Sequence, residues 1–335
     1  MKVSRICLSL LLLPPSIIHG WNFRPHPRQT IGQRLSASTS SSADNDDNRQ
    51  LRKETYISPI ISSQGDNLSL WEQIKLEATA TLDPEIEAGP LVYQAILSQP
   101  NLVEALVSVI AHEIETELIK ATELHNLFLE MLTPQDEIFI HNDVIAAATR
   151  SPSINSATTA VLFHTGLHAL VCYRVGHRLW KADRKGLAYY LQSTVSRRYS
   201  ADIHPACQMG GGIYLCSAAG VVIGETAVTG NDVSILHGVT LGGTGKERGN
   251  RHPKVGNGVI LEDGATVLGN IKVGDGALVT AKSIVTKPVE PLAVVSGVPA
   301  KMTRYRSLDI QDLTKCDLEQ HLVDKYVKEW QDYLP

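Results

Sequence analysis

The fold is decided by a stretch that reads VVIGETAVTGNDVSILHGVTL at residues 221–241. Every sixth residue in it, starting at Ile223, is aliphatic except Thr229. The same period continues on both sides of this stretch. It is interrupted by two inserted residues between Leu215 and Ile223 and by eight inserted residues between Leu241 and Val255. The positions on this period are Ile203, Met209, Leu215, Ile223, Thr229, Ile235, Leu241, Val255, Leu261, Val267, Val273, Val279 and Val285.

A six-residue aliphatic period is typical of a hexapeptide-repeat parallel β-helix, in which each repeat is one short strand and a turn. Strands stacked about 4.8 Å apart would bring the recurring side chains into one internal column. Glycine follows many of these positions, as at Gly224 and Gly242, and permits the turn. Because one repeat cannot bury its own apolar face, stability grows with stacking. We therefore predict a parallel β-helix domain over residues 201–300.

The region before the repeats has a helical pattern instead. Apolar residues recur at spacings of three and four, as on a buried helix face, at Leu102, Ala105, Leu106, Val109 and Ile110. We predict an all-helical domain over residues 66–200, in which Gly186 separates a last helix from the one before it. Residues 301–335 are polar and are predicted to form a C-terminal helical tail. The fold class is thus α+β.

The N-terminus has the composition of a targeting sequence. Residues 1–43 contain no Asp or Glu, and basic residues precede the apolar run 6–13. This pattern predicts a signal peptide over residues 1–20. Residues 21–65 are basic and rich in hydroxyl groups at first, which predicts a transit peptide and a disordered linker. The two in series indicate targeting to a complex plastid, and the alternative is the secretory pathway.

Composition excludes several other classes. The net charge of −4 offers no basic stripe for nucleic acid. Beyond the leader no stretch has the ~20 consecutive apolar residues that a membrane span needs. The four cysteines outside the leader show no metal-type spacing and no small disulfide framework, which favours a reducing compartment and predicts no metal site.

One long interruption of the repeat is the candidate functional loop. It reads GGTGKERGNRHPK at residues 242–254, and it is rich in glycine and basic residues. An insertion that breaks a strict period is where function tends to lie.

These features together resemble the serine O-acetyltransferase family. The matching motifs are ADIHPA (201–206), IGETAV (223–228), NDVSILHGVTLGGTGK (231–246), RHPK (251–254), LGNI (268–271) and GVPA (297–300). The resemblance implies transfer of acetyl from acetyl-CoA to the hydroxyl of L-serine, giving O-acetylserine for cysteine biosynthesis. It also implies a left-handed β-helix that forms a homotrimer, or a dimer of trimers, with active sites between neighbouring coils.

The resemblance also implies roles for particular residues. Asp202 would be the carboxylate that orients the catalytic base. Arg251 and His252 would bind the carboxylate of serine, for which the planar fork of arginine is suited. The groove for CoA would be lined by Gly242, Gly243 and Thr244.

Several positions depart from the family pattern. The family motif LDHATG contains an aspartate followed by the catalytic histidine. Residues 215–220 of this chain read LCSAAG instead. Cys216 therefore occupies the position of the aspartate, and Ser217 occupies the position of the catalytic base. Ser151 replaces a second aspartate of the serine site. The turns expected beside CoA carry larger residues than the family's and include Asp263 and Ala281.

Losing a general base typically lowers a rate by about 10²–10⁴, so the family mechanism would be inefficient with Ser217. Three alternatives follow. His252, His237 or His204 could replace the base; the acceptor could be another small molecule; or the chain could be a silent relative acting as an assembly or regulatory subunit. The family's plant-type tail ends in isoleucine and binds cysteine synthase, whereas this chain ends in Pro335, which predicts weak or absent binding.

Overall fold

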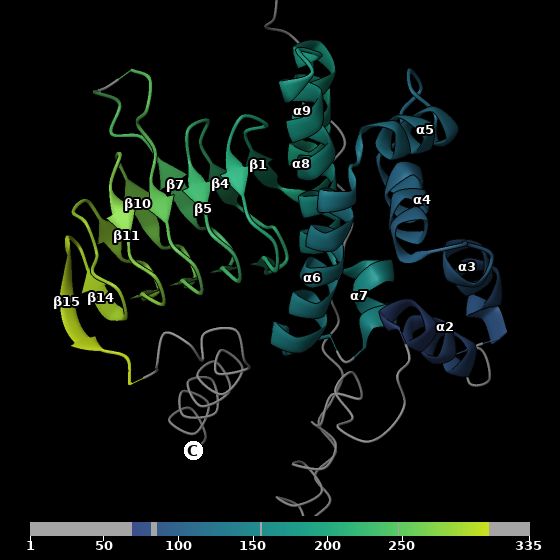
Figure 1. The fold of residues 1–335 in the computed structure, drawn as a ribbon, viewed down its shortest axis with the longest axis horizontal. Helices are drawn as coiled ribbons and strands as arrows, with labels where there is room; N and C mark the ends of the chain where they lie inside the picture. The colour runs from purple at the N-terminus through teal and green to yellow at the C-terminus, as the bar shows by residue number, and fades with distance from the viewer. Residues whose placement is uncertain (1–68, 82–85, 155, 247, 308–335) are drawn as a thin grey trace, which may run out of the picture. The chain divides into compact units, whose positions relative to one another are not determined.

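The computed structural model describes residues 69–307, except residues 82–85, 155 and 247. A helical part is followed by a stack of short parallel strands (Figure 1). This confirms the predicted order of a helical region and a parallel β-helix. The predicted leader and residues 308–335 of the predicted tail lie outside the described residues. The predicted start of a helical tail at residue 301 was wrong, because Ala300–Tyr305 is a strand that pairs antiparallel with the strand Ala293–Gly297.

The helical part follows the predicted periodicity. In α4 (Leu102–Ile114) the buried residues include Leu102, Leu106 and Ile110, and the Asn101 side chain caps the helix by accepting the Glu104 N–H at 2.9 Å. The other helical segments are α2 (Leu70–Thr81), η2 (Ile86–Ala88), α3 (Gly89–Val92), η3 (Tyr93–Leu97), α5 (Ala121–Met131), α6 (Pro134–Arg150), α7 (Ala157–Phe163), α8 (Thr165–Lys181) and α9 (Lys185–Tyr199). Within the described ranges, no helix is long and apolar enough to cross a membrane.

The predicted helix break at Gly186 was wrong. Helix α8 ends at Lys181 and α9 begins at Lys185, so Gly186 lies in the first turn of α9. The chain reverses through Asp183, whose φ of 60° is in the left-handed region. A polar residue with a short side chain tolerates this conformation, which is why the break needs no glycine.

The strands form three parallel sheets. Their orders are β1-β4-β7-β10-β13, β11-β8-β5-β2 and β15-β14-β12-β9-β6-β3, and only the last pair, β14 with β15, is antiparallel. The strands are β1 (Ala201–Ile203), β2 (Gln208–Met209), β3 (Tyr214–Leu215), β4 (Val221–Ile223), β5 (Val228–Thr229), β6 (Ser234–Ile235), β7 (Thr240–Gly242), β8 (Lys254–Val255), β9 (Ile260–Leu261), β10 (Thr266–Leu268), β11 (Lys272–Val273), β12 (Leu278–Val279), β13 (Ile284–Val285), β14 (Ala293–Gly297) and β15 (Ala300–Tyr305).

The periodic side chains form three columns, and the expectation of a single column was wrong. Each hexapeptide contributes one side of a three-sided coil, so neighbours in a column are three repeats apart in the sequence. In the first sheet Ile223 lies between Ile203 and Leu241. Every position on the period, Thr229 included, is buried.

Buried polar contacts join the helical part to the first coil. The Arg174 guanidinium donates to Asp143 Oδ2 at 2.9 and 2.5 Å, and Asp143 Oδ1 accepts the Ile213 N–H at 2.9 Å. Burial raises the pKa of Asp143, while Arg174 opposes that rise. The Tyr173 hydroxyl donates to the Cys207 carbonyl at 2.7 Å. Paired in this way, the charges position the helices against the end of the β-helix.

Candidate functional site

Two groups of predicted site residues lie at opposite ends of strand β4, in the sheet that begins with β1. One group lies in residues 216–220, the turn between β3 and β4, which we call the Ser217 turn. The other lies in residues 224–226 and 249–254, after β4 and before β8, which we call the Arg251 corner. In a single chain these two groups are therefore separated by the length of a strand.

Thr226 organises the Arg251 corner. Its hydroxyl oxygen accepts the backbone N–H groups of Arg251 at 3.0 Å and of His252 at 3.1 Å. The same hydroxyl lies 2.9 Å from Nδ1 of His252, and the Thr226 N–H donates to that nitrogen at 3.1 Å. One side chain thus fixes both residues that the resemblance assigns to substrate binding.

His252 is held as a hydrogen-bond donor. Because a backbone N–H can only donate, Nδ1 accepts, and the proton of the neutral ring is on Nε2. Burial, then the positive charge of Arg251, lowers the pKa of His252 and favours this neutral form. Gly224 makes room for the ring, since a Cβ there would lie 2.1 Å from its atoms. An Nε2–H of this kind can donate to a carboxylate.

The Arg251 guanidinium is positioned by two further contacts. One nitrogen donates to Glu225 Oε2 at 2.9 Å and another to the Gly249 carbonyl at 3.2 Å. Its side chain remains 32 % exposed, so part of the fork faces solvent. Lys254 closes the base of the loop, where it donates to the Asn250 side chain at 2.7 Å.

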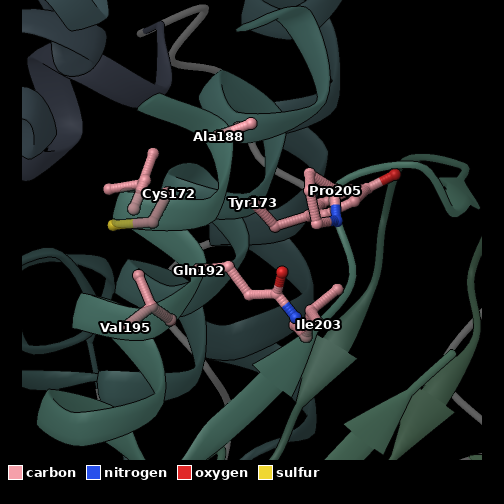
Figure 2. Close-up of a pocket in the computed structure, with 9 residues that line it drawn as sticks. Cys172, Tyr173, Ala188, Gln192, Val195, Ile203 and Pro205 are labelled. Carbon is pink, nitrogen blue, oxygen red and sulfur yellow. The ribbon is translucent and has the colours of Figure 1, made fainter. Parts of the chain in front are cut away.

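Asp202 lies on β1, beside this corner. Its Oδ1 accepts from Nε2 of Gln192 at 2.6 Å. Gln192 reaches β1 from α9, and it lines a cavity of about 10 Å³ together with Tyr173, Ile203 and Pro205 (Figure 2). That volume holds about one water molecule, so the cavity is a packing gap at the joint of α8, α9 and β1.

His204 lies two residues after Asp202, next to the Arg251 corner, where its N–H donates to the Ile223 carbonyl at 2.9 Å. Burial lowers its pKa, while Glu225 and Asp202 oppose that effect. Its Nδ1 accepts the Ala206 N–H at 3.1 Å, and its ring packs edge-on against Trp180, 5.2 Å between centroids. The hydrogen bond to Nδ1 and the packing on Trp180 fix the position of the His204 ring.

The Ser217 turn is held by its backbone. Ser217 and Ala218 have φ of 49° and 59°, so the two extra residues in the period form a left-handed turn. The Thr165 hydroxyl donates to the Ser217 carbonyl at 3.0 Å. Gly166 packs directly under the turn, because a Cβ there would lie 1.7 Å from the Leu215 oxygen. The N-terminus of α8 thus fixes the shape of this turn.

The side chains at this turn include no histidine that could act as the family's catalytic base. Ser217 is exposed and Cys216 is half-buried with a free thiol. Ser151 lies at the end of α6, where it is buried and its hydroxyl is 3.1 Å from that of Ser153. None of these groups carries a positive charge or a carboxylate. In the described part of the chain, no cluster of three or more His, Cys, Asp and Glu side chains could hold a metal ion.

The positions predicted for CoA fall into two places. Gly242 is the last residue of β7, and Gly243 and Thr244 follow it. Gly243 lies against Arg251, since a Cβ there would be 3.4 Å from the Arg251 side chain. Asp263 and Ala281 lie in turns stacked beyond the Ser217 turn, where Oε2 of the buried Glu262 accepts the Ala281 N–H at 2.9 Å. The Ala281 N–H therefore already has an acceptor within the chain.

Three residues of the site had no role in the sequence-based prediction: Thr226, Glu225 and Gln192. Thr226 and Glu225 belong to the IGETAV motif, so the motif was the available signal. Gln192 had no comparable signal, because its partner Asp202 lies on a strand outside its own helix.

Comparison with known proteins gives consistent matches. A sequence profile described as "Serine acetyltransferase, N-terminal" matches residues 70–172. Serine acetyltransferase 2 of Arabidopsis thaliana is 42 % identical over 282 residues, covering 82 % of this chain and 86 % of that protein.

Solved structures give the same result. Serine acetyltransferase from Brucella abortus strain S19, in complex with coenzyme A, is 40 % identical with a TM-score of 0.70, covering 74 % of this chain and 99 % of that one. The Neisseria gonorrhoeae serine acetyltransferase in complex with serine is 37 % identical with a TM-score of 0.68, covering 70 % of this chain and 98 % of that one. By sequence and by fold, the chain belongs to the serine acetyltransferase family.

Proposed function

We propose that this chain transfers the acetyl group of acetyl-CoA to the hydroxyl of L-serine, giving O-acetylserine and CoA. The observation that carries the proposal is the Arg251 corner. There Thr226 accepts the backbone N–H groups of Arg251 and His252, the Arg251 guanidinium is held by Glu225 and partly exposed, and the His252 ring presents an Nε2–H donor. This pair suits the carboxylate of an amino acid, because charge-assisted hydrogen bonds to a carboxylate are roughly twice as strong as neutral ones.

The loop beside this pair supports a site for acetyl-CoA as co-substrate. Gly242 and Gly243 present backbone without bulky side chains, and Lys246 and Arg248 are exposed on the same loop. Cations near an open backbone attract the phosphates of CoA. The Brucella relative bound to coenzyme A adds support from a structure with the same fold.

We further propose a homotrimer, in which the Arg251 corner of one chain faces the Ser217 turn of the next. The separation of the two groups within one chain supports this arrangement, because a single chain cannot place a serine carboxylate and hydroxyl at both. Asp202 and Ser151 would then contribute polar groups near the acceptor. The proposals for plastid targeting by residues 1–65 and for weak cysteine synthase binding concern segments outside the described residues.

The proposal is tested by measuring CoA release from acetyl-CoA with a thiol reagent, with and without L-serine. We expect release that depends on serine. Arg251→Ala should raise KM for L-serine about tenfold or more, because one charge-assisted contact contributes about 1.5–3 kcal/mol. Arg248→Ala is the matched control in the same loop and should leave that KM nearly unchanged.

An absence of serine-dependent CoA release by the purified full chain would overturn the proposed activity. Equal effects of the two arginine substitutions on KM would remove the assigned role of Arg251 while leaving the activity in place.

A further inference from the structure

The histidines near the site differ in which ring nitrogen can accept a proton. In His252 and His204, Nδ1 accepts a backbone N–H, from Thr226 and Ala206 respectively. The proton of each neutral ring is therefore on Nε2, which leaves no lone pair toward the site. Both rings are suited to donate and unsuited to act as a general base.

His237 has the opposite arrangement. Its Nδ1 lies 2.9 Å from Oδ1 of Asp263. The two atoms are at ion-pair distance and are not aligned as a hydrogen bond. A carboxylate this close repels a lone pair on Nδ1, so the neutral ring carries its proton on Nδ1 and its lone pair on Nε2. The His237 side chain is 52 % exposed and that of Asp263 only 18 %, so the pair presents the imidazole outward from a more buried carboxylate.

The pair lies on the same edge of the β-helix as the Ser217 turn. The Cys216 N–H donates to the Ile235 carbonyl at 2.9 Å and the Gly238 N–H to the Ala219 carbonyl at 2.8 Å, so residues 236–238 stack directly on the Ser217 turn. The Gly264 N–H donates to the His237 carbonyl at 2.8 Å, which places Asp263 one coil further. Neighbouring coils are about 4.8 Å apart. The imidazole is thus one coil away from the position of the family's base.

We propose that His237, held by Asp263, is the general base of this chain; the inference rests on the proposed function and names the base of that same site. Nε2 of His237 takes the proton of the serine hydroxyl as its oxygen attacks the thioester carbonyl carbon. The C–O bond forms, the C–S bond breaks, and the leaving thiolate takes the proton from Nε2. Asp263 is a positioning residue that keeps the lone pair on Nε2.

The test compares the full chain with His237→Asn in the CoA-release assay. The substitution should lower kcat about 10²–10⁴-fold, with KM for L-serine and for acetyl-CoA changed by less than about threefold. His141→Asn is the control, since His141 is a half-buried residue of α6 that has no part in the proposed site. Asp263→Asn should lower kcat with little change in KM, and Asp263→Glu should retain most of the rate.

A rescue separates loss of a base from loss of structure. Adding Cys216→Asp and Ser217→His to the His237→Asn variant should raise its kcat at least tenfold, because a histidine then occupies the family's base position. If His237→Asn does not fold, His237→Gln with the same rescue replaces it.

A serine-dependent wild-type rate that His237→Asn leaves within threefold would overturn this inference and leave the proposed function standing. A loss that the rescue does not reverse would also overturn it. A wild-type chain with no serine-dependent release would overturn the proposed function itself.

Discussion

The Ser217 turn and the Arg251 corner are built in opposite ways. At the Arg251 corner the side chains are the constrained part, since Thr226 holds the ring of His252 and Glu225 holds the Arg251 guanidinium. At the Ser217 turn the backbone is constrained by α8, through Thr165, while the Ser217 side chain is exposed.

This difference explains how the turn keeps its backbone shape although Ser217 replaces the family's histidine. A contact to a carbonyl oxygen is indifferent to the side chain that the residue carries. A residue other than histidine can therefore occupy position 217 without disturbing the coil. At the Arg251 corner a comparable replacement would break hydrogen bonds that only those side chains make.

The largest effect is expected from breaking the backbone support of the Ser217 turn. Gly166→Ala would place a Cβ 1.7 Å from the Leu215 oxygen, so α8 and the first coil must separate. We expect the free energy of unfolding to fall by about 3 kcal/mol or more. Denaturant unfolding followed by circular dichroism measures it.

Gly186→Ala is the matched control, because nothing lies within 4 Å of the Cβ position in that helical glycine. It should be neutral or stabilising, by up to about 1 kcal/mol. Similar losses in both variants would show that α8 does not support the turn in this way.

A smaller effect concerns acid stability at the same junction. His164 is buried against Tyr214 and its Nδ1 accepts the Leu167 N–H at 3.0 Å. Burial, then the charge of His168, lowers the pKa of His164 to about 4. The unfolded chain binds this proton near pH 6.5, so stability is complete above that pH and falls as the pH drops toward 4, by about 1.4 kcal/mol per pH unit.

His164→Asn should keep the helix cap, because an asparagine oxygen can accept the Leu167 N–H, and should remove this titration. Between pH 7 and pH 5, the free energy of unfolding should fall less in His164→Asn than in wild type, by about 2 kcal/mol. His112→Asn, at an exposed position on α4, should leave the wild-type pH dependence. Identical slopes in all three proteins, measured by thermal melts from pH 7 to 4, would contradict the assignment.

The smallest effect sharpens the other side of the comparison. Thr226→Val removes the hydroxyl that fixes Arg251 and His252, so we expect KM for L-serine to rise about tenfold, equivalent to about 1.4 kcal/mol. Thr226→Ser keeps the hydroxyl and should change KM little. Steady-state kinetics measures both, and an equal rise in the two variants would mean that the methyl group, and not the hydroxyl, organises the corner.

Much of the fold could be predicted from the sequence, because its signals are local and repeated. The six-residue period predicted the strands and their burial, and the three-and-four spacing at Leu102 and Leu106 predicted α4. The period did not show that three repeats make one coil, since the closure angle of the chain is a property of the stacked backbone. The break before α9 was misplaced because Asp183 turns the chain without glycine.

Residue identities alone predict the β-helix, the family and the serine at the position of the family's base, since each depends only on which residue occupies which position. Which histidine has a lone pair on Nε2 depends on the folded chain. His237 and Asp263 are 26 residues apart, and they meet because one coil plus the eight-residue loop brings the chain back to the same edge. Spacing along the chain brings the two residues to the same edge, but which ring nitrogen faces the carboxylate depends on the placement of the side chains in three dimensions.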